Sequence, residues 1–219
     1  MRSLRSRLSL LVGLITLPGY LVISADMLEN RQQALLNLEY QVEVTANELA
    51  ALQRRILIDT EAYLTHLVQL PEVQNPAAPA CGEFLAKILK LNTQFVNLGV
   101  PLASGDLLCN AHPLNYPVNV FDRSYFQEAL TNRRFSIGTF QLDRAANTTS
   151  INFGYPVTDL TTNEVRGVAV AVVSLAWWTQ YLESSNLPES STAFITDSQG
   201  TLIANYPANL LSWVQQSRK

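Results

Sequence analysis

The sequence has little charge and no excess of basic residues. Only 15% of its 219 residues are charged, and 15 Lys and Arg residues stand against 18 Asp and Glu residues. Because binding to phosphate backbones depends on clustered positive charge, this mildly acidic chain is not expected to bind nucleic acid. The low charge and a hydrophobic content of 47% also exclude an intrinsically disordered chain.

Recognisable catalytic and metal-binding patterns are missing as well. The sequence contains no GxSxG, Walker A, HExxH or Rossmann glycine pattern. Its two histidines, His66 and His112, have no Ser or Cys nucleophile beside them in a known motif, and the cysteines show no CxxC or Cys/His spacing. We therefore expect no enzyme activity in this chain, no cofactor and no metal site.

Negative charge is absent from the N-terminal leader. Arg2, Arg5 and Arg7 precede an uncharged run, Leu8 to Ala25, and the first acidic residue is Asp26. As a helix the run would rise about 27 Å, enough to cross a hydrocarbon core. Residues 1–25 are thus predicted to be a cytoplasmic tip and a transmembrane signal anchor, which places later residues outside the cytoplasm. A cleaved signal peptide and a buried soluble helix are the alternatives.

Cysteine is scarce, since the chain has only Cys81 and Cys109. In an oxidising compartment these residues are expected to form one disulfide, which would close a loop of about 28 residues and stabilise the fold by about 3 kcal/mol. Two unpaired buried thiols are the alternative.

Proline and glycine are both missing between Asp26 and Leu70, so residues 26–70 are predicted to form one long stalk helix of roughly 65 Å. Apolar residues recur at three- and four-residue steps, as one face of a helix requires. They include Leu35, Leu38, Val42, Leu49 and Leu64. We expect the lower part to pack against a partner helix in a homodimer and the upper part to lie on a domain. Two helices broken near Arg54 and Arg55 are the alternative.

A domain-sized module is expected over residues 71–187, after Pro71, Pro76 and Pro79 end the stalk. Its predicted helices cover Glu83–Leu91 and a segment that begins at an Asp122 N-cap. The predicted strands are Gln94–Leu102, Leu107–Ala111, Phe135–Leu142, Thr149–Val157 and the central run Val165–Ser174, which has no charge after Arg166. This order predicts an α+β fold with one antiparallel five-stranded sheet and flanking helices.

The C-terminal segment repeats part of this plan. Thr192–Pro207 has an apolar strand, a polar turn ending in Gly200 and a second apolar strand, as residues 94–113 do around Gly105. Residues 188–219 are therefore predicted to be the incomplete start of a second, similar module.

The segment DRSYFQEAL at residues 122–130, followed by FSIGTF, INFGYPVTD and VRGVAVAVVSL, resembles the double Cache sensor domains. These are PAS-like extracytoplasmic modules of bacterial chemoreceptors, histidine kinases and diguanylate cyclases. The resemblance extends over residues 1–207. It implies that a small ligand binds in the membrane-distal module, against the sheet and under the helix that carries Arg123.

The resemblance also indicates a set of ligand-binding residues. Arg123 offers a planar fork of donors suited to a carboxylate, and Tyr125 and Phe126 would form walls beside it. Candidates to close the pocket are Tyr116, Phe140, Asn152 and Tyr155. A structural role for Arg123, as a salt bridge or cap, and plain core packing for the aromatic residues are the alternatives.

The sequence departs from the pattern of those family members that bind amino acids. Family members that bind amino acids place an aspartate on the last sheet strand, whereas Val168–Val173 contains no acid. A carboxylate, another small anion or no ligand at all therefore fits better than an α-amino acid.

Together these signals predict the extracytoplasmic ligand-sensing part of a receptor in the bacterial inner membrane. No kinase, cyclase or methyl-accepting region follows in the sequence. The alternatives are a membrane-tethered binding or accessory protein that acts through a partner and, less favoured, an exported hydrolase with a cryptic site.

Overall fold

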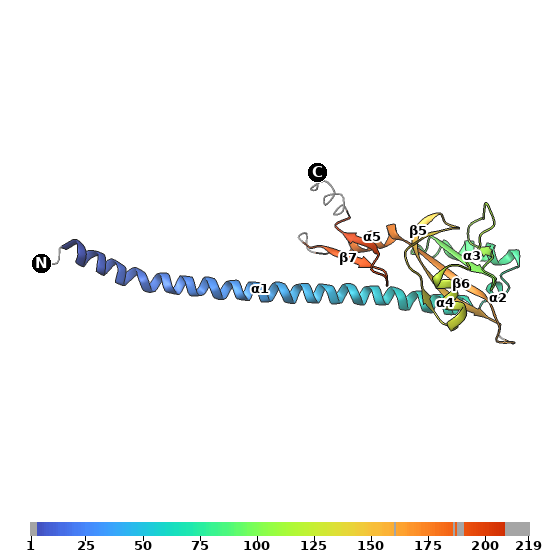
Figure 1. The fold of residues 1–219 in the computed structure, drawn as a ribbon, viewed down its shortest axis with the longest axis horizontal. Helices are drawn as coiled ribbons and strands as arrows, with labels where there is room; N and C mark the ends of the chain where they lie inside the picture. The colour runs from blue at the N-terminus through green and yellow to red at the C-terminus, as the bar shows by residue number, and fades with distance from the viewer. Residues whose placement is uncertain (1–3, 160, 186, 188–190, 209–219) are drawn as a thin grey trace. The chain divides into compact units, whose positions relative to one another are not determined.

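The computed structural model describes residues 4–159, 161–185, 187 and 191–208. The chain divides into two compact units, Met1–Leu52 and Gln53–Lys219. A single helix, α1 (Leu4–Leu67), accounts for the described part of the first unit and continues into the second (Figure 1). It runs through Arg54 and Arg55 without a break, so one long helix is present rather than two shorter ones.

Among the residues of α1 whose burial is described, the buried ones lie in its C-terminal turns. Leu64 and Leu67 are buried, whereas Leu35, Leu38 and Val42 remain more than half exposed. Within the described residues no helix is long and apolar enough to cross a membrane. Most of the predicted anchor, Leu8–Ala25, lies outside the residues whose side chains are described.

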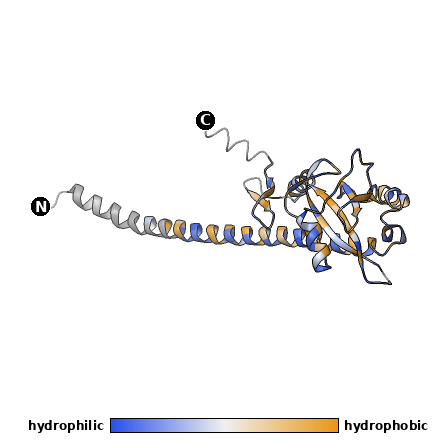
Figure 2. Ribbon diagram, turned by 45° about the vertical axis from the view of Figure 1, so that its right-hand side comes forward, coloured by the Kyte–Doolittle hydropathy of each residue, from blue (hydrophilic) through white to orange (hydrophobic). Residues whose placement is uncertain are grey.

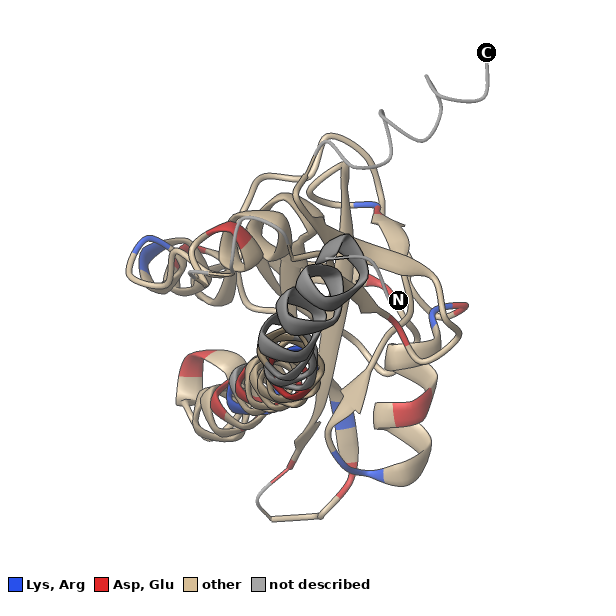
Figure 3. Cartoon of the chain, turned by 90° about the vertical axis from the view of Figure 1, so that its left-hand side faces the viewer, with Lys and Arg blue, Asp and Glu red and all other residues tan. Residues whose placement is uncertain are grey.

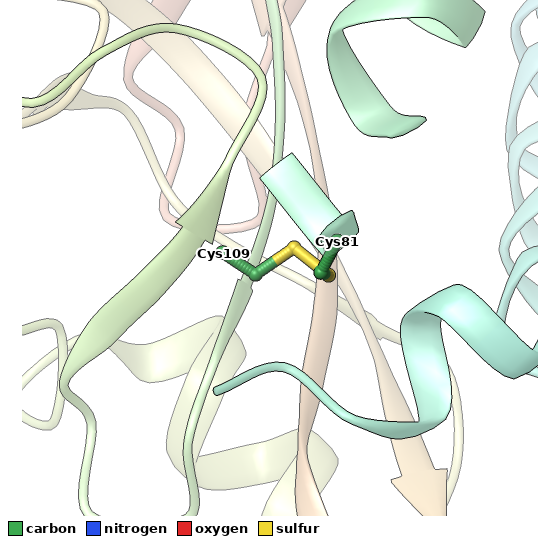
Figure 4. Close-up of a disulfide and its surroundings, with 2 residues drawn as sticks. All are labelled: Cys81 and Cys109. Atoms are coloured by element: carbon green, nitrogen blue, oxygen red, sulfur yellow. A yellow bond between two sulfur atoms is a disulfide. The ribbon is translucent and has the colours of Figure 1, made fainter. Parts of the chain in front are cut away.

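Two short helices connect α1 to the sheet: α2 (Pro71–Gln74) and α3 (Pro79–Leu89). Each begins with proline, whose fixed φ suits the first helical position and whose missing N–H is not needed there. Cys81 in α3 forms a disulfide with Cys109, with the two Cα atoms 5.6 Å apart (Figure 4). The predicted pairing is therefore present, and it joins α3 to the sheet.

The second unit is built around an antiparallel sheet with the order β2-β1-β6-β5-β3, and β4 also pairs with β5. The strands are β1 (Asn97–Pro101), β2 (Leu107–Asn110), β3 (Ser136–Ile137), β4 (Gln141–Asp143), β5 (Thr148–Thr158) and β6 (Val165–Ser174). Since β3 and β4 pair with successive parts of β5, they fill one strand position. The predicted α+β fold with a five-stranded antiparallel sheet is confirmed.

The centre of the sheet is β6, which has the predicted bounds. From Gly167 to Ser174 every residue is buried, and the strand pairs with β1 on one side and β5 on the other. The strands are largely apolar (Figure 2), and most charged residues lie on helices and turns (Figure 3). This distribution is what a strand covered on both faces requires.

Two segments differ from the predictions. Helix α4 spans Ser124–Asn132, and its N-cap is Arg123, without a side-chain cap bond. The predicted Asp122 cap is wrong because both oxygens of that carboxylate accept from Arg144 instead. The predicted strand Phe135–Leu142 is interrupted between β3 and β4.

The chain then continues into α5 (Leu175–Glu183) and a separate hairpin. The Ser174 hydroxyl accepts from the backbone N–H of Trp177 and caps α5. Strands β7 (Ala193–Thr196) and β8 (Leu202–Tyr206) form a two-stranded sheet, with Gly200 at φ 81° in the turn. Residues 188–190 and 209–219 of the predicted second module lie outside the described residues.

Candidate functional site

A small cavity lies between the sheet and α4, where the resemblance implies a ligand site. Its volume is about 20 Å³, and we call it the sheet cavity. Its apolar lining includes Val118 and Val120 from the loop before α4 and Val170 and Val172 from β6. Its polar lining consists of Asn97, Asn110, Tyr125 and Asp143.

Asn97 and Asn110 occupy neighbouring strands on the wall formed by β1 and β2. The Asn97 amide nitrogen donates to Asn110 Oδ1 at 2.9 Å, and the Asn110 amide nitrogen donates to the carbonyl of His112 at 2.8 Å. The buried oxygen Asn97 Oδ1 has no donor among the described residues. Because a buried acceptor without a partner is unfavourable, the wall offers a place for a ligand N–H or O–H.

Asp143 supplies a buried carboxylate from the opposite side. Its Oδ1 accepts from the backbone N–H groups of Ala145 and Ala146, at 3.0 and 2.6 Å. Its Oδ2 accepts from the amide nitrogen of Asn152 at 2.8 Å, and Ser150 donates to Asn152 Oδ1 at 2.7 Å. These bonds fix the carboxylate at the end of β4.

Tyr125 projects from α4 between these groups and is only 2% exposed. Its pKa is raised to about 12, mainly by burial. A hydrogen bond with Asn152 lowers the pKa, and the negative charge of Asp143 raises it. The phenol is therefore neutral at ordinary pH and keeps its proton for donation.

Arg123 and Phe126 flank Tyr125 but are not among the residues that line the sheet cavity. The Arg123 Nη2 donates to the carbonyl of Leu142 at 3.1 Å, directly beside Asp143. Phe126 is completely buried in the core, with its ring centre 6.2 Å from that of Phe121.

The remaining predicted residues are spread around this region. Asn152 contacts Asp143 as described, whereas Tyr116 and Phe140 are 56% and 40% exposed. Tyr155 is half-buried on β5. Since side chains alternate along a strand, it lies on the face opposite Asn152 and α4. The structure thus places Tyr125 in the cavity lining and Asn152 against the lining residue Asp143, and leaves the other predicted residues beside the cavity or on another face.

The loop over residues 111–121 covers the cavity and is fastened by Arg144. The guanidinium donates to both oxygens of Asp122, at 2.6 and 2.8 Å, and to the carbonyl of Asn119 at 2.6 Å. Tyr116 donates from its hydroxyl to the Arg144 carbonyl at 2.8 Å. The paired guanidinium lowers the pKa of Asp122, chiefly through the hydrogen bond. We call the Asp122–Arg144 pair the latch.

Sequence reasoning missed Asn97, Asn110 and Asp143. The available signal was the position of each residue: Asn97 interrupts the apolar run FVNLGV, and Asn110 ends LLCN. A lone polar residue in a buried strand needs a partner inside the fold. Among the described residues no three His, Cys, Asp or Glu side chains gather in a way that could hold a metal ion.

Solved structures similar to this chain include extracellular, ligand-binding and sensor domains. The sensor domain of the histidine kinase DctB from V. cholerae has 18% identity and a TM-score of 0.62, with 85% of this chain and 77% of that chain covered. The ligand-binding domain of the Campylobacter jejuni chemoreceptor Tlp3, in complex with 4-methylisoleucine, has 17% identity and a TM-score of 0.59, with 77% and 68% covered.

The chain spans only part of a further similar domain. For the extracellular domain of rpHK1S-Z16 the identity is 18% and the TM-score 0.59, with 68% of this chain and 62% of that chain covered. No curated protein sequence matches the chain.

The sequence itself carries the family assignment. The family model described as "Cache domain" matches residues 28–218, which is most of the chain. This match agrees with the order of strands and helices around the sheet cavity and confirms the resemblance drawn from DRSYFQEAL. The chain belongs to the Cache domain family.

Proposed function

We propose that the chain is the extracytoplasmic ligand-sensing part of a membrane-bound signal-transduction receptor. The observation that supports this most directly is a buried cavity against the sheet of a Cache domain, with Asn97, Asn110, Tyr125 and Asp143 in its lining. Tlp3 is a chemoreceptor whose ligand-binding domain holds 4-methylisoleucine, and DctB is a histidine kinase with a sensor domain of this fold. In this proposal the chain binds and transmits, and any catalysis belongs to an output domain.

The ligand is proposed to be a small molecule with a carboxylate. Arg123 is the guanidinium next to the cavity wall, because its partner Leu142 precedes Asp143. Exchanging the Leu142 carbonyl for a ligand carboxylate would give Arg123 a charged and bidentate partner. The proposed binding set keeps Arg123, Tyr125 and Asn152 and gains Asn97 and Asp143 from the cavity lining. Tyr155 is removed because it lies on the opposite face of the sheet, and Phe126, Tyr116 and Phe140 are removed because they do not line the cavity.

The position of Asp143 favours an α-amino acid as the ligand after all. Val168–Val173 has no acid to hold an ammonium group, but Asp143 brings a carboxylate to the same cavity from β4. A ligand with both charged groups would place its carboxylate at Arg123 and its ammonium at Asp143. Since the cavity has a volume of only about 20 Å³, the covering loop must move to admit it.

The membrane organisation proposed is the one that the sequence predicts. Residues 1–25 form a cytoplasmic tip and anchor in the bacterial inner membrane, 26–70 the stalk, 71–187 the membrane-distal module and 188–219 the start of a second module. The exposed residues Leu35, Leu38 and Val42 support a homodimer through the stalk, because such a row needs a partner helix. A shift between the two stalk helices would carry the signal.

A thermal-shift screen tests the ligand proposal. The full chain is heated with L-amino acids, with the corresponding deaminated acids and with the corresponding amines. A ligand at 100 times its Kd adds about 2.7 kcal/mol to the free energy of unfolding. The carboxylates should raise the Tm of the wild type and of Arg133→Ala, a control at the other end of α4, but not of Arg123→Ala.

The outcomes distinguish the contribution of the ligand's carboxylate from that of its ammonium group. If the amino acid stabilises more than the deaminated acid, Asp143→Asn should remove that difference. Stabilisation that survives Arg123→Ala would contradict the role of Arg123, and a protein that responds to none of these compounds would contradict the proposed ligand class.

A further inference from the structure

A second and much larger cavity lies at the edge of the sheet, beside the β7–β8 hairpin. Its volume is about 650 Å³, within the range of roughly 300–1,000 Å³ that is usual for small-molecule sites. We call it the hairpin cavity. Its walls come from the last turns of α1, from α4 and β3, from β5 and from the turn between β7 and β8. It shares no lining residue with the sheet cavity.

Part of the lining of the hairpin cavity is apolar, and the rest is polar. Ile137, Ile151 and Phe153 line it from the sheet, and Ile195 and Ile203 line it from the hairpin. Phe135 stacks on Phe153 with ring centres 5.9 Å apart, which gives this side a flat aromatic surface. Such a surface suits the apolar body of a ligand.

Trp178, which also lines the cavity, carries one donor without a partner. The residue is only 2% exposed, and its indole Nε1–H has no acceptor among the described residues. A tryptophan N–H that is buried usually finds a partner, because an unpaired donor inside a protein is unfavourable. An oxygen atom of a bound molecule would satisfy it.

The charges around the cavity restrict the ligand further. Three carboxylates line it, those of Glu61, Glu128 and Asp197, against the single guanidinium of Arg134. This excess of negative charge disfavours an anion. The oxygen that meets Trp178 should therefore belong to a neutral group.

The hairpin wall is held against the sheet by a specific bond. Asp197 Oδ2 accepts from the backbone N–H of Phe140 at 3.0 Å, while Oδ1 accepts from the N–H groups of Gln199 and Thr201. The same carboxylate thus shapes the turn and ties it to the segment between β3 and β4. The wall is fixed by more than apolar contact.

We propose that the hairpin cavity is a second binding site, specific for a small neutral molecule with an apolar body and one carbonyl oxygen that accepts from Trp178. This site is separate from the sheet cavity and does not depend on the function proposed for it.

The test uses the full chain in lipid nanodiscs with isotope-labelled tryptophan, and three probes with the same aromatic body. Phenylacetamide is neutral and carries a carbonyl, phenylacetate is an anion, and phenethylamine is a cation without an acceptor. Phenylacetamide should shift the Trp178 indole N–H proton signal downfield in a saturable way. Phenylacetate should bind more weakly because of the surrounding carboxylates, and phenethylamine, which has no acceptor, should not produce the downfield shift.

Variants distinguish the site from nonspecific binding. Trp178→Phe should weaken phenylacetamide binding about tenfold, the effect of a lost hydrogen bond, while the adjacent Trp177→Phe should leave it unchanged. Ile137→Trp fills the cavity from a residue that is 43% exposed and should abolish binding in a folded protein.

A Trp178 signal that stays in place up to about 10 mM phenylacetamide would overturn the proposal. So would equal affinity in Ile137→Trp, or a signal in the free protein already at the position of a hydrogen-bonded indole.

Discussion

Arg144 donates to both carboxylate oxygens of Asp122, at 2.6 and 2.8 Å, from the turn that joins β4 to β5. The pair connects the end of the covering loop to the strand that carries Asp143. Both side chains are substantially exposed, at 39% and 60%, so water screens their attraction. The latch is therefore expected to control the motion of the loop more than the stability of the fold.

Replacing Arg144 by Gln should loosen the loop over residues 111–121. The free energy of unfolding should fall by no more than about 1 kcal/mol, as for other exposed ion pairs. Amide hydrogen exchange in the loop should become faster, because the bonds to Asp122 and Asn119 are lost. The control is Arg55→Gln, which removes an exposed pair with Asp59 in α1. Equal exchange in the two variants would contradict a role for the latch.

Protonation of Asp122 at low pH should break the Asp122–Arg144 pair, as the Arg144→Gln substitution does. The pKa of Asp122 is lowered by its bond to Arg144, so its contribution is complete above the unfolded value of about 3.9. The contribution disappears as the pH falls from there through the lower folded-state pKa. Loop exchange, corrected for its intrinsic pH dependence, should rise in this acid range in the wild type and stay constant in Asp122→Asn.

Removing the disulfide should destabilise the second unit. The bond closes a loop of 28 residues, so the double variant Cys81→Ala, Cys109→Ala should lose about 3 kcal/mol of unfolding free energy. Denaturant unfolding measures the loss. A reductant should lower the midpoint of the wild type but not that of the double variant, and an unchanged wild-type midpoint after complete reduction would show that the bond contributes little.

Asp143 and Asn152 should be energetically coupled. Asp143→Ala removes the acceptor for three N–H groups, and each buried donor without a partner costs about 1–3 kcal/mol. Asn152→Ala removes one of those donors. In a double-mutant cycle we expect a coupling energy of about 0.5–3 kcal/mol, measured by denaturant unfolding. Simple additivity would mean that the bond between the two side chains is unimportant.

Tyr125 should make stability depend on alkaline pH. Its pKa is about 12 in the folded protein and about 10 in an unfolded chain. The folded state therefore retains a proton that the unfolded state loses, so stability is complete below about pH 10 and falls as the pH rises towards 12. Tyr125→Phe should remove this part of the pH dependence. Thermal unfolding between pH 9 and 12 measures it, and parallel curves for the two proteins would contradict the assignment.

The sequence predicts the elements that depend on local patterns. The run Val165–Ser174 has the same bounds in the structure, and the part of it that is buried, from Gly167 onward, carries no charge. The long helix follows from the missing proline and glycine, and the disulfide follows from a single pair of cysteines. Each of these depends on residues that are close in sequence or have one available partner.

The cavity could not be predicted in the same way. Asp122 has the local features of an N-cap, and only the fold reveals that Arg144 is close enough to bind it. Phe135–Leu142 contains enough apolar residues for one strand, but Asp197 binds the backbone of Phe140 from a distant part of the chain. Asn97 and Asp143 become a site only because β1 and β4 border the same space.

The volume of about 20 Å³ in the sheet cavity has a consequence for affinity. Such a space holds about one water molecule, so the described conformation is not the one that binds the proposed ligand. The measured Kd then equals the intrinsic Kd divided by the fraction of molecules that are open. A change that favours opening tightens binding without touching the ligand, so natural variation far from the binding residues can set the concentration at which the domain binds its proposed ligand.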